Sequence, residues 1–320
     1  MRVVLCYPVE ARHLAQIADV APGLEIVDAG QDRVATELLS ADIFCGHAKV
    51  PVPWAQVVQR GRLRWIQSSA AGLDHCLVPS VIGSSILVTS ASGVFADQVA
   101  EHTVALVTGL LRSLPEFCAA QQRKEFIRLP TRDLHRATIG IVGFGGNGRR
   151  VAEVLAPYRG RILATDMYPR DRPTHVAALW PADRLDDLLA EADVVVLCVP
   201  LTPVTRGMIS AAALARMRPG AILVNVARGG VVVEDDLVAA LRSGHLGGAA
   251  LDVTEIEPLP PASPLWELTR VLITPHVGAQ SAWRIDETTN LFCENLDRYL
   301  GGRPLRNLVD KQLGYPPPRA

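Results

Sequence analysis

A glycine-rich segment, GFGGNG at residues 143–148, has the spacing of a turn that binds a pyrophosphate. It follows the apolar run Thr138–Val142 and opens a helical pattern. In that position Gly143 permits a tight turn, and Gly145 lets the backbone approach a phosphate at the positive helix N-terminus. Gly148 permits close packing of the helix on the strand. The three glycines alone are weak evidence, because an ordinary strand-to-helix turn has the same composition.

An acidic residue at the right distance strengthens this interpretation. Asp166 lies 18 residues past Gly148, at the end of the next strand-like run. A carboxylate there accepts hydrogen bonds from the adenine ribose hydroxyls of a dinucleotide. It should repel a 2′-phosphate, so we expect NAD rather than NADP. Three arginines that are close in the sequence keep NADP open as the less favoured cofactor: Arg149, Arg150 and Arg170.

Three polar side chains in the second half of the chain have the types used in acid–base chemistry and anion binding. Arg228 ends one apolar run, Glu257 lies in the loop after another, and His276 follows a third. Ligands of a parallel α/β sheet bind beyond the carboxyl ends of its strands, which makes these positions compatible with one site. Taken singly, each residue has an ordinary role as a surface charge or turn residue, and the spacing alone does not bring them together.

Short apolar runs alternate with helical patterns along most of the chain, which predicts βαβ units and parallel sheets. The first hundred residues contain five strand-like runs: Val3–Tyr7, Leu24–Val27, Ile43–Cys45, Leu63–Ile66 and Ile86–Thr89. The second block contains six: Thr138–Val142, Arg161–Thr165, Asp193–Val199, Ala221–Val226, Gly248–Asp252 and Arg270–Thr274. Long helices are expected at Phe95–Leu114 and Ser281–Leu300, with an irregular stretch at Gln121–His135.

Composition excludes several classes of protein. The 320 residues suggest two domains, and a formal net charge of −1 gives no basic footprint for nucleic acid. The six cysteines are scattered without C-x-x-C spacing, so we expect no metal site, no disulfide framework and a reduced, cytoplasmic protein. The longest apolar stretch, Val194–Leu201, is far shorter than a bilayer span. No membrane partner is expected.

Several segments together resemble the D-isomer-specific 2-hydroxyacid dehydrogenase family. They match in the family's order and span almost the whole chain: Gly72–Asp74, Ala100–His102, Val142–Gly148, Asn225–Gly230, Ala250–Val253, Glu257–Pro258 and Thr274–Gly278. The resemblance implies an α/β fold of two doubly wound parallel-sheet domains. A Rossmann NAD-binding domain would cover residues 96–281, and a discontinuous, flavodoxin-like substrate domain residues 1–95 and 282–320. It also implies a homodimer in which the helix near 96–114 takes part.

The resemblance implies catalytic roles for the three polar residues. His276 would be the general acid in ketone reduction and the base in the reverse reaction, a task that suits an imidazole. Glu257, preferred to Glu255 because it directly precedes Pro258, would orient that imidazole and stabilise its protonated form. Arg228 would bind the α-carboxylate of the substrate with its planar fork.

Further residues carry over as neighbours of the cofactor and the substrate. The cofactor would be bordered by Gly143, Gly145, Gly146, Asn147, Gly148, Asp166, Pro200, Thr205, Val226, Ala227, Asp252 and Gly278. The substrate would be bordered by Ala71, Gly72, Arg228 and His276. The chain departs from the family at Gly146-Asn147, where a larger pair is commoner, and this would loosen the contact with the pyrophosphate. Phe126 stands near a common Trp, and Phe126 or Trp283 could shape the substrate pocket.

We therefore expect NADH-dependent interconversion of a small 2-oxo acid and its D-2-hydroxy acid, with glyoxylate or hydroxypyruvate weakly favoured as substrate. Two alternatives remain open. One is formate or phosphite oxidation on the same fold, although Glu257 argues against formate because formate dehydrogenases carry Gln there. The other is an NAD-sensing binding protein of the corepressor type. A Rossmann methyltransferase would lack the elements at Glu257 and His276.

Overall fold

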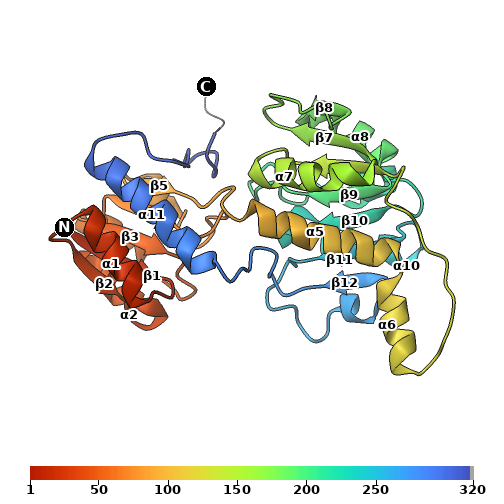
Figure 1. The fold of residues 1–320 in the computed structure, drawn as a ribbon, viewed down its shortest axis with the longest axis horizontal. Helices are drawn as coiled ribbons and strands as arrows, with labels where there is room; N and C mark the ends of the chain where they lie inside the picture. The colour runs from red at the N-terminus through yellow and green to blue at the C-terminus, as the bar shows by residue number, and fades with distance from the viewer. Residues whose placement is uncertain (318–320) are drawn as a thin grey trace. The chain divides into compact units, whose positions relative to one another are not determined.

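The computed structural model describes residues 1–317 and separates into two compact units. The smaller unit comprises Met1–Val94 and Ser281–Ala320, and the larger comprises Phe95–Gln280. Residues 318–320 of the expected substrate domain lie outside the described part. Each unit contains a sheet whose strands are all parallel, with helices packed on both faces (Figure 1). The predicted α/β class with two doubly wound parallel-sheet domains is confirmed.

The smaller unit has five strands in the order β2-β1-β3-β4-β5, the flavodoxin-like order. The strands are β1 (Arg2–Cys6), β2 (Glu25–Asp28), β3 (Ile43–Gly46), β4 (Trp65–Ser68) and β5 (Leu87–Thr89). The helices are α1 (Ala11–Val20), α2 (Gly30–Glu37), α3 (Trp54–Arg60), α4 (Pro79–Ile82) and α11 (Arg284–Leu300). Helices α1 and α11 pack on one face of the sheet, and α2, α3 and α4 pack on the other.

The larger unit has seven strands in the order β12-β11-β10-β9-β6-β7-β8. Counted within the unit, this is the Rossmann order 3-2-1-4-5-6 extended by one strand. The strands are β6 (Thr138–Val142), β7 (Arg161–Asp166), β8 (Ala178–Pro181), β9 (Val194–Leu197), β10 (Ile222–Asn225), β11 (Gly248–Leu251) and β12 (Val271–Ile273). The helices are α5 (Ala96–Leu111), α6 (Leu114–Gln122), α7 (Gly146–Leu155), α8 (Leu185–Glu191), α9 (Ala211–Arg216) and α10 (Glu234–Arg242).

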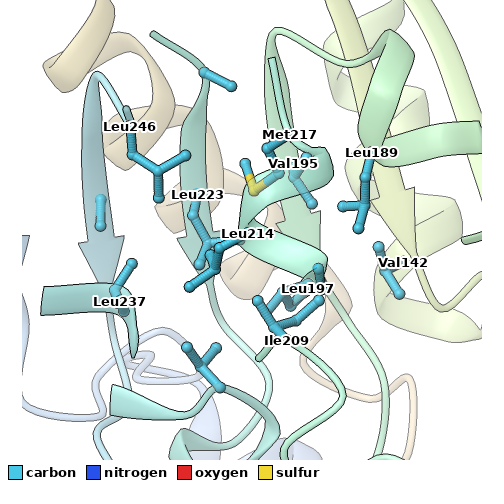
Figure 2. Close-up of a cluster of buried hydrophobic side chains, with 14 of the residues drawn as sticks. Val142, Leu189, Val195, Leu197, Ile209, Leu214, Met217, Leu223, Leu237 and Leu246 are labelled. Carbon is cyan, nitrogen blue, oxygen red and sulfur yellow. The ribbon is translucent and has the colours of Figure 1, made fainter. Parts of the chain in front are cut away.

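The continuous apolar runs become strands because both faces of the larger sheet are covered. Within β9, Val195 and Leu197 face a core shared with α8, α9 and α10, whereas Val194 and Val196 face one shared with α5 and α7. Figure 2 shows the first of these cores, in which the strand side chains meet Leu189 and other helix side chains. Full burial of such a side chain stabilises the fold by about 1.5–3 kcal/mol. The sequence of a strand that is buried on both faces is therefore a continuous apolar run and does not alternate between apolar and polar residues.

The structure departs from the expected elements at three places. The helix expected to reach Leu114 ends at Leu111, because Ser113 adopts a left-handed conformation with φ 54° and the chain restarts as α6. Strand β8 was not expected, and it is a half-buried edge strand that ends at a proline. Helix α11 begins at Arg284 rather than at Ser281.

Helix α5 buries its apolar side within its own unit. Val99, Leu106, Val107 and Leu110 are buried, and the helix packs against α7, β10 and β11. The apolar side of α5 is therefore occupied within the unit, and it does not support the dimer contact that the resemblance implied for this helix. Within residues 1–317, no single helix meets the length and apolarity needed to cross a bilayer, although the bent pair α5–α6 passes that test when taken together.

Candidate active site

The glycine-rich turn joins β6 to α7, and each spaced glycine meets a different constraint. Gly143 has φ 92°, and a Cβ there would lie 2.8 Å from the carbonyl carbon of Cys198. A Cβ on Gly148 would collide with the carbonyl oxygen of Gly143. A Cβ on Gly145 would meet no atom within 4 Å, so open space lies beside the backbone at the start of α7. That space at a helix N-terminus fits a pyrophosphate.

Asp166 ends β7 and is bonded to this turn. One carboxylate oxygen, Oδ2, accepts the backbone N–H of Phe144 at 2.6 Å, and Oδ1 accepts that of Tyr168 at 2.8 Å. The guanidinium of Arg149 lies 4.8 Å from the centre of the Phe144 ring and donates to the carbonyl oxygens of Arg170 and Asp171. The carboxylate is thus held beside the glycine turn, and a cation lies over the same turn.

His276 and Glu257 come together at the carboxyl edge of the larger sheet. The imidazole Nδ1 of His276 lies 2.7 Å from Glu257 Oε2, and the other oxygen of that carboxylate accepts the backbone N–H of Thr254 at 3.2 Å. Both side chains remain accessible, with 45% of His276 and 38% of Glu257 exposed. The other acid of this loop, Glu255, donates its backbone N–H to the carboxylate of Glu234. Because a carboxylate accepts Nδ1–H, Nε2 is the nitrogen left to exchange a proton.

Arg228 follows β10 in a loop that is held by the side chain of Asn225. The buried amide of Asn225 accepts the N–H of Ala227 at 3.0 Å and donates to the carbonyl oxygen of Arg228 at 3.0 Å. The next residue, Gly229, leaves no room for a Cβ, because the Thr254 carbonyl of the Glu257 loop lies against it. The loops that carry Arg228 and Glu257 are therefore in direct backbone contact. The guanidinium of Arg228 donates to the carbonyl oxygen of Ala227 at 2.7 Å.

Asp252 lies directly after β11 and is only 4% exposed. Its oxygens accept the hydroxyl of Thr274 at 2.7 Å and the backbone N–H groups of Val277 and Gly278 at 2.9 Å each. Burial alone would raise the pKa of this carboxyl, but the hydrogen bonds from His102, Thr274 and the two N–H groups outweigh it and lower the pKa to about 2. Asp252 is therefore an anion at neutral pH.

The remaining predicted residues lie in loops at strand ends. The hydroxyl of Thr205 donates to the carbonyl oxygen of Pro200 at 2.6 Å, which closes the loop after β9. Ala71 and Gly72 follow β4 in the smaller unit, beyond a turn in which Ser68 Oγ accepts the N–H of Ala70. Val226 begins the loop of Arg228, directly after β10. Within residues 1–317, no group of three or more His, Cys, Asp or Glu side chains is placed to hold a metal ion.

Two aromatic residues considered for the substrate pocket are exposed. Phe126 is fully exposed in the segment after α6, and Trp283 is 67% exposed just before α11. The exposure of Phe126 and Trp283 does not support a role for either side chain in lining a pocket.

Sequence reasoning missed two residues that support the site. Asn225 holds the Arg228 loop, and Thr274 binds the carboxylate of Asp252. The signal available in the sequence was a polar residue at the end of an apolar run, where the side chain must find partners when it is buried. His102 also contacts Asp252 and Thr274.

Comparison with known proteins identifies the family. Residues 104–278 match the family model described as D-isomer specific 2-hydroxyacid dehydrogenase, NAD binding domain. The chain belongs to this family. It is 35% identical over 258 residues to a glyoxylate reductase of Thermofilum pendens (strain DSM 2475 / Hrk 5). The alignment covers 78% of this chain and 76% of the relative. A crystal structure of a D-isomer specific 2-hydroxyacid dehydrogenase from Xanthobacter autotrophicus Py2, in complex with NADPH and MES, has a TM-score of 0.84 at 30% identity and covers 98% of this chain and 99% of that one.

A longer relative shows that the family also includes larger proteins. The chain is 33% identical over 283 residues to a D-3-phosphoglycerate dehydrogenase of Mycobacterium tuberculosis (strain ATCC 25618 / H37Rv), which covers 88% of this chain. This chain spans about half the length of that relative, with 53% of it covered. As a member of the 2-hydroxyacid dehydrogenase family, the chain contains the family's NAD-binding domain.

Proposed function

We propose that this protein interconverts a small 2-oxo acid and its D-2-hydroxy acid with a nicotinamide cofactor. The observation that carries the proposal is the 2.7 Å contact between His276 Nδ1 and Glu257 Oε2, in the loops next to that of Arg228. These loops lie at the carboxyl ends of β10, β11 and β12, where parallel α/β sheets bind their ligands. An acid–base pair and a carboxylate anchor are the groups that reduction of a 2-oxo acid requires.

The protonation chemistry follows from this geometry. Glu257 holds the Nδ1–H of His276, so Nε2 donates a proton to the substrate oxygen during reduction and accepts one during oxidation. Glu257 also stabilises the imidazolium state that precedes donation. Arg228 binds the α-carboxylate of the substrate with its planar guanidinium. The bound nicotinamide supplies or takes up the hydride at C2 of the substrate.

NAD is the proposed cofactor. Gly143, Gly145, Gly146, Asn147 and Gly148 would hold the pyrophosphate, and Asp166 would accept the ribose hydroxyls. The support for NAD over NADP is the Asp166 carboxylate beside the turn, because its charge repels a 2′-phosphate. Arg149 over the same turn is the group that would favour NADP.

The remaining cofactor contacts would come from the loops at the strand ends. Pro200, Thr205, Val226, Ala227, Asp252 and Gly278 would border the cofactor, with Asp252 near the nicotinamide. Glyoxylate or hydroxypyruvate is the favoured substrate type, since the similar protein from Thermofilum pendens is named a glyoxylate reductase. We also propose a homodimer, and the support for it is the family resemblance alone.

The test measures NADH and NADPH consumption with glyoxylate, hydroxypyruvate, pyruvate, 2-oxoisocaproate and phenylpyruvate. We expect turnover with the small acids and a kcat/KM at least about tenfold higher with NADH, since one unfavourable charge contact is worth roughly that factor. A preference for NADPH would contradict the role of Asp166. NADH binding without turnover on any of these acids would contradict the proposed reaction and favour formate or phosphite oxidation or an NAD-sensing protein.

A further inference from the structure

A hydrogen-bonded line of side chains joins helix α5 to the turn that carries His276. His102 of α5 lies with Nε2 2.9 Å from Thr274 Oγ1 and 3.3 Å from Asp252 Oδ1. The Thr274 hydroxyl is in turn 2.7 Å from the same Asp252 oxygen. Asp252 follows β11 and Thr274 follows β12, so the line connects one helix with the ends of two neighbouring strands.

Only one direction of donation satisfies this line. Asp252 is ionised at neutral pH because its pKa is about 2, and an ionised carboxylate only accepts. The single hydroxyl hydrogen of Thr274 therefore points to Asp252. The oxygen of Thr274 is then an acceptor toward His102, so His102 must carry its hydrogen on Nε2. The tautomer of His102 thus follows from the charge of Asp252.

The far end of the line is the turn of His276. Asp252 accepts the N–H groups of Val277 and Gly278 through its side chain, and that of His276 through its carbonyl oxygen at 2.8 Å. His276 has φ 54°, in the left-handed region that non-glycine residues avoid. A Cβ on Gly278 would lie 2.8 Å from Asp252 Oδ2, which shows how closely the carboxylate approaches this backbone.

We propose that His102 is a positioning residue for His276, acting through Thr274 and Asp252. By donating to Thr274, His102 keeps the threonine hydroxyl directed at Asp252. The carboxylate of Asp252 then holds the N–H groups of Val277 and Gly278, which fixes the turn after the left-handed His276 and keeps its Nδ1 aimed at Glu257. The role is separate from proton transfer, because His102 contacts neither His276 nor Glu257 through any of these bonds.

The first test reads the turn directly and does not depend on turnover. Hydrogen–deuterium exchange is followed in the peptide over residues 274–280 of the full-length protein with NADH bound. In His102→Leu we expect the amides of Val277 and Gly278 to exchange about tenfold faster, the change that loss of one hydrogen bond produces. His102→Gln keeps a donor at the position of Nε2 and should retain the wild-type protection. Glu101→Gln, an exposed neighbour on α5, is the matched control.

The second test measures kinetics and rests on the proposed 2-oxo acid reduction. His102→Leu should lower kcat about tenfold with little change in the KM for NADH, and His102→Gln should restore most of the loss. Thr274→Val should reproduce the loss and Thr274→Ser should not. The double variant His102→Leu/Thr274→Val should cost less than the sum of the two single variants, because both side chains act on the same carboxylate of Asp252.

Two outcomes overturn the inference. One is unchanged exchange at Val277 and Gly278 in both His102→Leu and Thr274→Val. The other is fully additive losses of kcat in the double variant. Failure of the wild-type protein to reduce any 2-oxo acid would contradict the proposed function only, because the exchange experiment still decides the role of His102.

Discussion

The residue on which the proposed chemistry depends adopts an unfavourable backbone conformation. A left-handed φ on a non-glycine residue costs about 1–2 kcal/mol, and His276 has φ 54°. The N–H groups of His276, Val277 and Gly278 all bond to Asp252, and these bonds offset the cost. The imidazole is therefore aimed at Glu257 by the backbone as well as by its own hydrogen bond. A site held in this way requires little reorganisation when substrate binds.

Replacing the proposed acid should separate chemistry from binding. In His276→Ala we expect turnover to fall about 10²–10⁴-fold, the usual contribution of general acid–base catalysis, while the Kd for NADH changes little. Steady-state kinetics and NADH fluorescence titration measure the two quantities. His135→Ala, at an exposed histidine whose Nδ1 lies 3.3 Å from the Tyr158 carbonyl oxygen, is the control. Comparable turnover in wild type and His276→Ala would contradict the mechanism.

The ionised state of Asp252 predicts how stability depends on pH. Its pKa falls from 3.8 to about 2 on folding, so the carboxylate stabilises the fold above pH 3.8 and loses that contribution as the pH falls toward 2. The shift corresponds to about 2 kcal/mol at neutral pH. Asp252→Asn should therefore lower the free energy of unfolding by about this amount at pH 7 and by roughly half as much at pH 3.

Urea unfolding of the wild type and Asp252→Asn at both pH values measures this difference. A difference that stays constant between pH 7 and pH 3 would show that the stabilisation does not come from the charge of Asp252.

At this scale the sequence indicates which residue types are available but not how they pair. Arg228, Glu257 and His276 stand out because each is polar and lies beyond a strand, and the choice between Glu255 and Glu257 depended on a neighbouring proline. His102 could not be linked to Thr274, because the two are 172 residues apart and the pairing depends on how α5 lies against β11 and β12.

At the scale of the elements, the β6–α7 turn is the one proposed to hold the cofactor. Its glycines look alike in the sequence, but their surroundings differ. Gly148 faces the carbonyl of Gly143 in the folded chain, whereas Gly145 faces open space. The fold therefore requires a glycine at position 148. At position 145 the fold leaves space, and the proposed pyrophosphate is the reason for a glycine there.

A matched pair of alanine variants tests this distinction. Gly145→Ala should leave the Tm unchanged and raise the Kd for NADH at least about tenfold, because the new methyl group occupies the space proposed for the pyrophosphate. Gly148→Ala should lower the free energy of unfolding by about 1–3 kcal/mol, since backbone atoms must shift to admit it. Thermal unfolding and fluorescence titration measure both. Wild-type affinity in a folded Gly145→Ala would place the pyrophosphate elsewhere.

Elements buried on both faces were predictable, and those at edges were not. The central strands β6, β9 and β10 are continuous apolar runs, so the sequence located them. Strand β8 is half exposed and short, and helix α6 follows a left-handed Ser113 that the sequence does not mark. Both depend on contacts made after the central sheet has formed.

At the scale of the whole molecule, each unit has its own hydrophobic cores. The two cores of the larger unit draw only on residues between Ala100 and Ile273, and the two of the smaller unit only on residues 3–88 and 285–309. Each unit therefore has hydrophobic cores of its own, as an independently folding domain requires.

The larger unit should fold when it is produced alone. A fragment of residues 95–280 contains all seven strands of its sheet and the glycine-rich turn. We expect it to unfold cooperatively and to bind NADH with a Kd within about tenfold of that of the full chain. Circular dichroism and NADH fluorescence measure these properties. A fragment without a cooperative transition would show that the smaller unit is needed for folding.

The placement of α11 has a consequence for synthesis on the ribosome. Phe292 and Leu296 of α11 cover Val3 and Leu5 of β1, although β1 is made first and α11 near the end. The roughly 190 residues of the larger unit emerge in between, which takes about 10–40 seconds at 5–20 residues per second. During that interval α1 is the helix that covers this face of the first sheet and the area under α11 stays exposed, while the larger unit can already fold. The middle of the chain can therefore fold before the first sheet is complete, and the part of β1 that α11 later covers is apolar surface exposed to aggregation in the meantime.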